Sequence, residues 1–417
     1  MKYLIALMGG MEIHMEEKRE QSGTSVFSNA LIWFSCAVSV AELLTGTELE
    51  PLGMKMGLLA VLAGHAAGCL LLITAGLIGA YAGKNSMQSV GLSFGSGGSR
   101  IFAALNVFQL VGWQAVLIYT SARSANGIFQ MGGWAWALII GVLTCVWILL
   151  GRRTLRLFNA ASALILFMLI AVLCRVIFAG GGAAAGPESG QVMSFGMGFE
   201  LSIAMPLSWL PMISDYTYKA ARPVKTAVVS SIVYCLAGSW MYITGLGAAC
   251  MTHETSIDAV VLAAGLGTAG LMIIVLSCVT TNFIDAFSCG ESTLALTGEG
   301  SDSDKIRKAA GIMDTVVGTA LAVIFPIDNI SGFLYLIGSV FAPMISVQAA
   351  DFFILRRRYK SVLYKGRFDI AAFAVWAAGF VIYRLLMRVD TPVGNTLPDM
   401  VITMLLTILV RKITSRR

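Results

Sequence analysis

The sequence is short of charged residues. Asp, Glu, Lys and Arg together make up only 12% of its 417 residues, whereas a soluble domain carries roughly 25%. Hydrophobic residues account for 57% of the chain, and the mean hydropathy is +0.80. These values exclude a soluble globular fold, because no compact domain of this size could bury so much apolar surface.

Catalytic and metal-binding motifs are also missing. The chain has no G-x-x-x-x-G-K-[ST] phosphate loop, no H-E-x-x-H motif and no Cys/His cluster at metal-ligand spacing. Its eight cysteines form no C-x-x-C pair and lie almost all within apolar runs, so we expect neither a disulfide framework nor a zinc site. The sequence therefore predicts a protein that is not an enzyme and needs no cofactor.

Long apolar runs, in contrast, are abundant. Runs of about 17 to 28 residues alternate with charged or Gly/Pro-rich breaks, and a helix needs roughly 20 residues to cross a bilayer. We therefore expect an all-α polytopic membrane protein, surrounded by lipid, with about twelve transmembrane helices. The expected spans are 25–47, 57–80, 101–128, 134–150, 156–178, 194–216, 226–250, 268–297, 309–325, 330–355, 369–387 and 398–413. Residues 256–267 are expected to form a separate extracellular segment.

The basic residues predict the orientation of these spans. The net charge is +6, but Lys and Arg occupy short loops instead of one basic face, so no nucleic-acid partner is expected. With the N-terminus inside, 23 basic residues fall on the cytoplasmic side and five on the outer side. This asymmetry predicts an inner-membrane protein with both termini cytoplasmic. Met1, Met11 and Met15 remain alternative starts, and the oligomeric state stays open.

Two of the predicted spans carry interruptions. The run 25–47 contains Glu42, and the run 194–216 contains Pro206 and Pro211. These spans are five apart, as expected for two inverted five-helix repeats whose first helices are broken and hold substrate and ion at the midplane. The resulting organisation is a cytoplasmic tail at 1–21, repeats at 22–178 and 194–358, and two additional helices with a cytoplasmic tail at 369–417.

The span 268–297 carries polar residues on one face. Ser277, Thr281 and Asp285 are spaced four apart, with Thr280 and Asn282 beside them. Hydroxyls and a carboxylate suit a hard cation together with a polar substrate. The alternative is that the hydroxyls bond to their own helix and serve close packing.

An amide and two indoles predict how a ring would be held. Gln109 and Trp113 lie one turn apart on the span 101–128, and Trp209 stands between the two prolines. An amide offers a donor and an acceptor to the edge of an aminopyrimidine, and an indole stacks on its ring. Trp113 is equally compatible with a core position, and His65 is interpreted as a packing histidine.

Five segments resemble the nucleobase:cation symporter-1 family, in particular its CytX-like subfamily of predicted hydroxymethylpyrimidine transporters related to cytosine permeases. They are WFSCAVSVAELLTGTELEPLG (33–53), LNVFQLVGWQAV (105–116), MPLSWLPMISDYTYKA (205–220), SCVTTNFIDAFSCG (277–290) and FAPMISVQAADFFILRRR (341–358). The resemblance implies a LeuT-like fold of two inverted five-helix repeats plus two further helices, working by alternating access.

The resemblance also implies roles for particular residues. The substrate ring is expected between Trp113 and Trp209, and the remaining substrate contacts are expected from Glu42, Gln109, Ser208, Asn282 and Asp285. A sodium ion is expected at backbone carbonyls of the first span and hydroxyls of the eighth: Val38, Ala41, Ser277, Thr280 and Thr281.

These residues leave two alternatives. Glu42 and Asp285 are intramembrane carboxylates, so a proton is the alternative coupling ion to sodium. An amino-acid or amine permease of the same architecture is the alternative function, although Glu42 at the first break would repel a substrate carboxylate. The prediction is a secondary transporter that imports a small nitrogen heterocycle, hydroxymethylpyrimidine or a related nucleobase, with a cation.

Overall fold

The computed structural model describes residues 23–150, 152–179, 192–253, 262, 265, 267–297, 303–325, 327, 330–356 and 368–414. Over these residues the chain is helical between short turns, and the one β-bridge joins Thr24 to Ala220. The all-α prediction is confirmed. The predicted tail at 1–21 and most of the predicted segment 256–267 lie outside the described residues.

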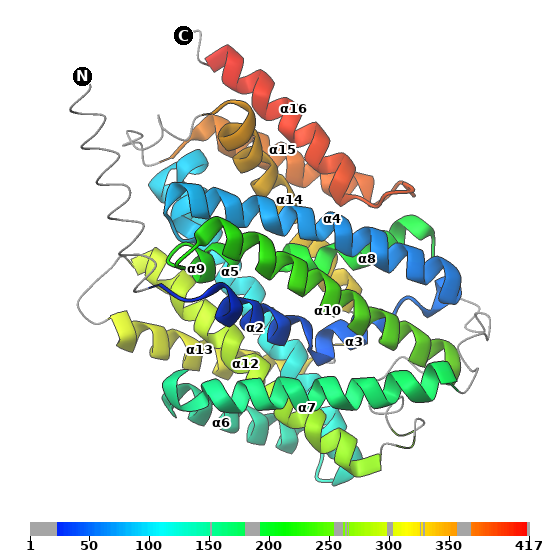
Figure 1. Cartoon of the computed structure of the whole chain (residues 1–417). Coiled ribbons are helices and arrows are strands. Elements are labelled where there is room, and N and C mark those ends of the chain that lie inside the picture. The colour runs from blue at the N-terminus through cyan, green and yellow to red at the C-terminus, as the bar shows by residue number, and fades with distance from the viewer. Residues whose placement is uncertain are drawn as a thin grey trace.

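The helices follow one another in the order that the hydropathy pattern predicts (Figure 1). They are α2 (Val26–Ala37), α3 (Val40–Thr47), η1 (Glu50–Leu52), α4 (Gly53–Ala82), α5 (Ser86–Ile128), α6 (Gly133–Leu150), α7 (Arg152–Ala179), α8 (Phe195–Ser208), α9 (Ile213–Thr217), α10 (Pro223–Thr252), α12 (Gly267–Thr297), α13 (Ser303–Ile324), α14 (Ile330–Ala349), η3 (Ala350–Ile354), α15 (Ile370–Leu386) and α16 (Thr396–Thr414).

Each predicted span overlaps one of these helices or a pair of them. Within the described residues, six helices are long and apolar enough to cross a membrane, and the bent pair α2/α3 makes a seventh. The count of twelve spans stays a prediction that agrees with this helix order.

The third span differs most from its prediction, because α5 begins at Ser86 and not near 101. Asn85 caps this start, and a capping box joins Asn85 to Gln88. Gly95 then breaks the helical geometry with a φ of 81°, which glycine adopts without a steric penalty. The Ser/Gly-rich stretch before 101 lacks the apolar run that revealed the other spans, so hydropathy alone did not detect it.

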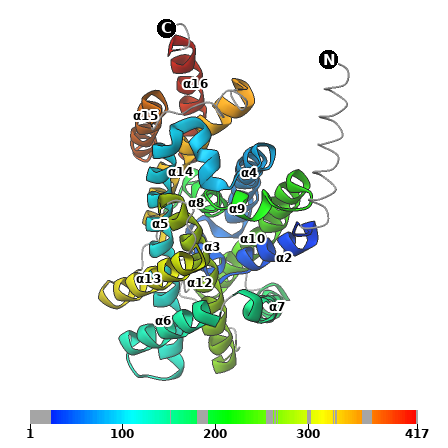
Figure 2. The same cartoon turned by 90° about the vertical axis from the view of Figure 1, so that its left-hand side faces the viewer.

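The broken and continuous helices pack together in two groups. Helix α4 packs against α8 and α10, while α5 packs against α12 and α13. Figures 1 and 2 show α15 and α16 together at one edge of the molecule. The two groups bring α3, α5, α8 and α12 around one central space, where the site lies.

Candidate functional site

The first helix break lies between α2 and α3, which meet at an angle of 44°. Val38 leaves the helical region with φ −82° and ψ 73°. Ser39 then starts α3, where its hydroxyl accepts a hydrogen bond from the backbone N–H of Glu42 at 3.4 Å. Glu42 is therefore in the first turn of α3, with its side chain fully buried.

The second break separates α8 from α9. Pro206 lies within the last turn of α8, and Trp209 to Met212 form a turn before α9 begins at Ile213. The Gln109 side chain of α5 donates a hydrogen bond to the backbone oxygen of Ser208 at 2.8 Å. A proline cannot donate a backbone hydrogen bond, so this interruption follows directly from the sequence.

The two breaks face one pocket, which α5 and α12 complete. Seven of the predicted site residues line it: Ala41, Glu42, Trp113, Ser208, Trp209, Thr281 and Asp285. The other lining residues are Cys36, Ser39, Leu117, Met205 and Met212. The pocket therefore joins residues from five helices, namely α2, α3, α5, α8 and α12.

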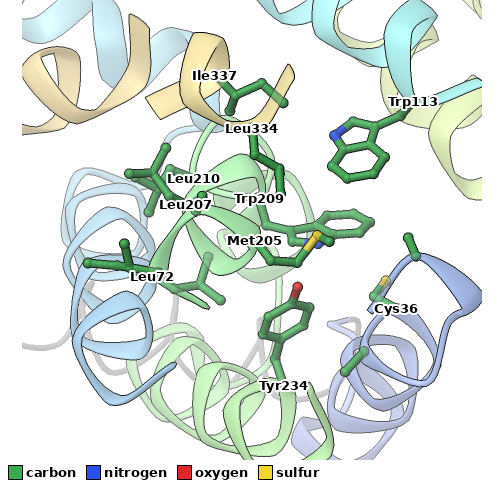
Figure 3. Packing of buried hydrophobic residues seen from close by; sticks show 14 of the residues in the cluster. Cys36, Leu72, Trp113, Met205, Leu207, Trp209, Leu210, Tyr234, Leu334 and Ile337 are labelled. Atoms are coloured by element: carbon green, nitrogen blue, oxygen red, sulfur yellow. The ribbon is translucent and has the colours of Figure 1, made fainter. Parts of the chain in front are cut away.

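Two of the lining residues, Trp113 and Trp209, are indoles that also contact further aromatic rings. Trp209 is edge-on to Trp33, with ring centroids 5.6 Å apart, and to Tyr234, with centroids 6.2 Å apart. Trp113 is edge-on to Phe333 at 5.3 Å. In the view of Figure 3, the Trp209 and Met205 side chains lie between Trp113 and Tyr234, and Cys36 is beside them on α2. These T-shaped contacts with neighbouring rings hold each indole in place.

Glu42 has a distinct set of buried neighbours. Tyr234 donates a short hydrogen bond to its Oε1. The Nε2 atom of His65 lies 4.0 Å from Oε2, and neither of these two atoms has a hydrogen-bond partner. The His65 ring packs edge-on against Tyr242, with centroids 4.6 Å apart, and its Nδ1 lies 3.2 Å from the Val61 carbonyl. His65 thus packs as expected, but directly behind a lining carboxylate.

Two predicted substrate residues lie outside the lining. Gln109 donates a hydrogen bond to the Ser208 backbone oxygen and another, at 2.9 Å, to Asn106 Oδ1. The first of these hydrogen bonds joins α5 to the second helix break. Asn282 is fully buried, and its backbone oxygen accepts a hydrogen bond from Gln114 at 2.6 Å. Direct substrate contact by either side chain therefore remains a prediction.

The residues predicted for a cation are partly brought together. Ala41 and Thr281 line the pocket, while Val38, Ser277 and Thr280 are buried outside its lining. The hydroxyls of Thr280 and Thr281 donate to the Ser277 backbone oxygen at 2.7 and 3.1 Å. Their hydrogens are thereby used within the helix, and the oxygen lone pairs remain for a ligand.

Sequence reasoning missed several lining residues. Cys36, Leu117, Met205 and Met212 are small or apolar and carry no pattern that separates them from core residues. Ser39 did have a signal, because Ser39 and Glu42 form the S-x-x-E pattern that starts a helix. That pattern places the break just before Ser39.

Comparison with known proteins adds to this geometry. A family model for permeases of cytosine/purines, uracil, thiamine and allantoin matches residues 15–410. The cytosine permease of Escherichia coli strain K12 is 27% identical over 298 residues, covering 68% of this chain and 67% of the relative. The purine-cytosine permease of Saccharomyces cerevisiae is 23% identical over 378 residues, covering 82% and 70%.

Solved structures share the fold. Mhp1, a nucleobase-cation-symport-1 family transporter in a closed conformation with bromovinylhydantoin bound, matches with a TM-score of 0.78 and 17% identity over 94% of this chain and 93% of its own. A Na⁺-coupled sialic acid symporter matches with a TM-score of 0.60 and 12% identity, over 92% and 89%. The predicted LeuT-like fold is confirmed.

Proposed function

The chain belongs to the family of permeases for cytosine/purines, uracil, thiamine and allantoin, and from this premise we propose that it imports hydroxymethylpyrimidine or a closely related pyrimidine together with sodium. As a family member it is a multi-pass membrane transporter and not an enzyme. The observation that supports the substrate class most strongly is one pocket that combines two indoles with two carboxylates.

A neutral aminopyrimidine suits this lining. Its flat ring stacks on Trp209, and its exocyclic amino group donates to the carboxylate of Asp285 or Glu42. Stacking and a buried hydrogen bond each contribute on the order of 1 kcal/mol, and a charged acceptor contributes somewhat more. The lining residues include two carboxylates and no Lys, Arg or His, which disfavours an anionic substrate.

Sodium suits the oxygens beside the first break. The carbonyls of Val38 and Ala41 and the hydroxyls of Ser277, Thr280 and Thr281 supply neutral oxygen ligands, which a hard monovalent cation prefers. Because Ala41 and Thr281 also line the substrate pocket, an ion there would stabilise the gap that receives the ring. Ion and substrate are then expected to raise each other's affinity by the same factor.

The rival function is an amino-acid or amine permease. An amino acid would place its carboxylate near Glu42 and Asp285, which disfavours it, whereas a simple amine would leave the indoles without a flat partner. Thermal stabilisation of the purified protein separates these cases. Hydroxymethylpyrimidine, cytosine, uracil, an amino acid and an aliphatic amine are compared, each with and without sodium.

We expect the pyrimidines to stabilise the protein, and sodium to enhance the effect. Trp209→Ala and Asp285→Asn should each weaken pyrimidine binding by about tenfold or more, which is about 1.4 kcal/mol. Trp134→Ala is the matched control, because that indole is 62% exposed and lies outside the pocket. Unchanged binding in Trp209→Ala, or stabilisation by the amino acid instead of the pyrimidines, would refute the proposed substrate.

A further inference from the structure

A second group of buried polar side chains lies where α5, α12 and α13 meet. It consists of Gln114 on α5, Asn282 on α12 and Asp314 on α13, which we call the three-helix cluster. The exposed fractions of these side chains are 0%, 0% and 2%. None of the three lines the substrate pocket.

Two glycines place Asp314 at this junction. A Cβ atom added at Gly311 would lie 2.9 Å from the Ala286 backbone oxygen of α12, and one added at Gly318 would lie 2.6 Å from Gln114 Cβ of α5. Residues three and four apart share a helix face, so Asp314 lies between these two close approaches. Asp314 is therefore in the part of α13 that lies closest to α5 and α12.

The same contacts place the other two residues beside the junction. Asn282 is one turn before Ala286 and thus on the side of α12 that faces α13. The Nε2 atom of Gln114 donates to the Asn282 backbone oxygen at 2.6 Å, which ties α5 to α12. The Gln114 side chain is also close enough to the Asp314 carboxylate to interact with it.

The cluster has too many acceptors. No hydrogen bond of ordinary length and angle reaches either carboxylate oxygen of Asp314, Oε1 of Gln114 or Oδ1 of Asn282, and none leaves Nδ2 of Asn282. Buried polar atoms in native proteins are normally paired. The titratable groups within electrostatic reach of Asp314 include Asp285 and Cys289, neither of which is a cation.

We propose that Asp314, Gln114 and Asn282 form a second sodium site, separate from the one proposed at the first helix break. A single negative charge balances one monovalent cation, and four unpaired oxygens are ligands of the kind that a hard cation takes.

The second site is coupled to the pocket through α12. Asp285 lines the pocket, and the next residue, Ala286, makes the contact with Gly311. Asp285 and Asp314 repel each other when both are charged. A cation on Asp314 relieves this repulsion and so favours an ionised Asp285, which is the form that accepts a hydrogen bond from a substrate amino group.

Equilibrium binding of radioactive sodium to the purified full-length protein tests this proposal. We expect two bound ions per wild-type protein at saturation, one in Asp314→Asn, one in Thr281→Ala and none in the double variant. Asp399→Asn is the matched control, because Asp399 is also buried with one unpaired oxygen but lies on α16. The control should bind two ions.

The outcomes separate the two proposed sites. One ion per wild-type protein, lost in Thr281→Ala and kept in Asp314→Asn, overturns the second site and leaves the first standing. One ion that Asp314→Asn removes and Thr281→Ala keeps supports the second site and overturns the first. If the wild-type protein binds no sodium at all, both proposed sites are overturned. That result needs only the wild-type protein, so it holds even if a variant does not fold.

Discussion

At the residue scale, the pocket contains two carboxylates in different surroundings. Glu42 is held by the Tyr234 hydroxyl and has His65 behind it, whereas Asp285 lies on α12 near the carboxylate of Asp314. The two carboxylates are therefore held by different neighbours. If the proposed second sodium site is correct, the charge on Asp314 changes the ionisation of Asp285 but not the contacts that hold Glu42.

Removing the Tyr234 hydroxyl should weaken substrate binding. In Tyr234→Phe the Oε1 atom of Glu42 loses its buried donor, so the carboxylate is no longer held in place at the pocket. We expect several-fold weaker pyrimidine binding, measured by calorimetry. Tyr242→Phe is the control, because its hydroxyl donates to the Leu201 carbonyl at 3.1 Å and not to Glu42. Equal losses in both variants would show a general packing effect and contradict a specific role for Tyr234.

Sequence patterns identified the residue types of the site better than their exact contacts. Trp209 was recognisable because prolines flank it, and it lines the pocket. Gln109 was recognisable as an intramembrane amide, but its donor is used by the Ser208 carbonyl of another helix. That partner is 99 residues away in the sequence, and helical periodicity carries no information about contacts between distant helices.

At the element scale, the first helix break depends on close packing of α3 against α10. A Cβ atom at Gly46 would lie 2.7 Å from the Tyr242 Cα, and one at Gly245 would lie 3.1 Å from the Thr47 backbone nitrogen. Small residues allow such approach between membrane helices. The composition shows that glycine is common, but only the fold shows which glycines make these contacts.

Gly46→Ala should therefore destabilise the protein. The added methyl group would overlap the α10 backbone, and overpacking of this kind costs about 1–3 kcal/mol. We expect a lower unfolding temperature in detergent by fluorescence-detected thermal melting. Gly133→Ala is the matched control, because its added Cβ meets nothing within 4 Å. Should Gly46→Ala melt with the wild type, the tight α3/α10 packing would be wrong.

At the scale of the whole molecule, α15 and α16 are tied to the rest by two buried polar groups. The Glu200 carboxylate of α8 accepts hydrogen bonds from Tyr383 at 2.5 Å and Thr396 at 2.6 Å. At the opposite end of α16, Arg411 pairs with Asp351 at 2.7 Å and with Asp369 at 2.5 Å. Hydropathy predicted both helices, but it could not predict which charges pair.

The orientation of the whole molecule is a separate prediction. The excess of basic residues in loops assigned to the cytoplasm predicts that both termini lie inside. Fusions of alkaline phosphatase to either terminus should be inactive, and fusions of a fluorescent protein that matures only in the cytoplasm should be fluorescent. Phosphatase activity at either terminus would contradict this topology.

The central claim is that sodium drives pyrimidine uptake through the pocket between the two helix breaks. Uptake of labelled hydroxymethylpyrimidine into proteoliposomes, held at one pH on both sides, tests it most directly. Uptake should rise with an inward sodium gradient and fall sharply in Thr281→Ala, whose hydroxyl lines the pocket. The claim would be contradicted if uptake were independent of sodium, were driven by an imposed proton gradient and were unchanged in Thr281→Ala. Coupling would then be assigned to Glu42 and Asp285.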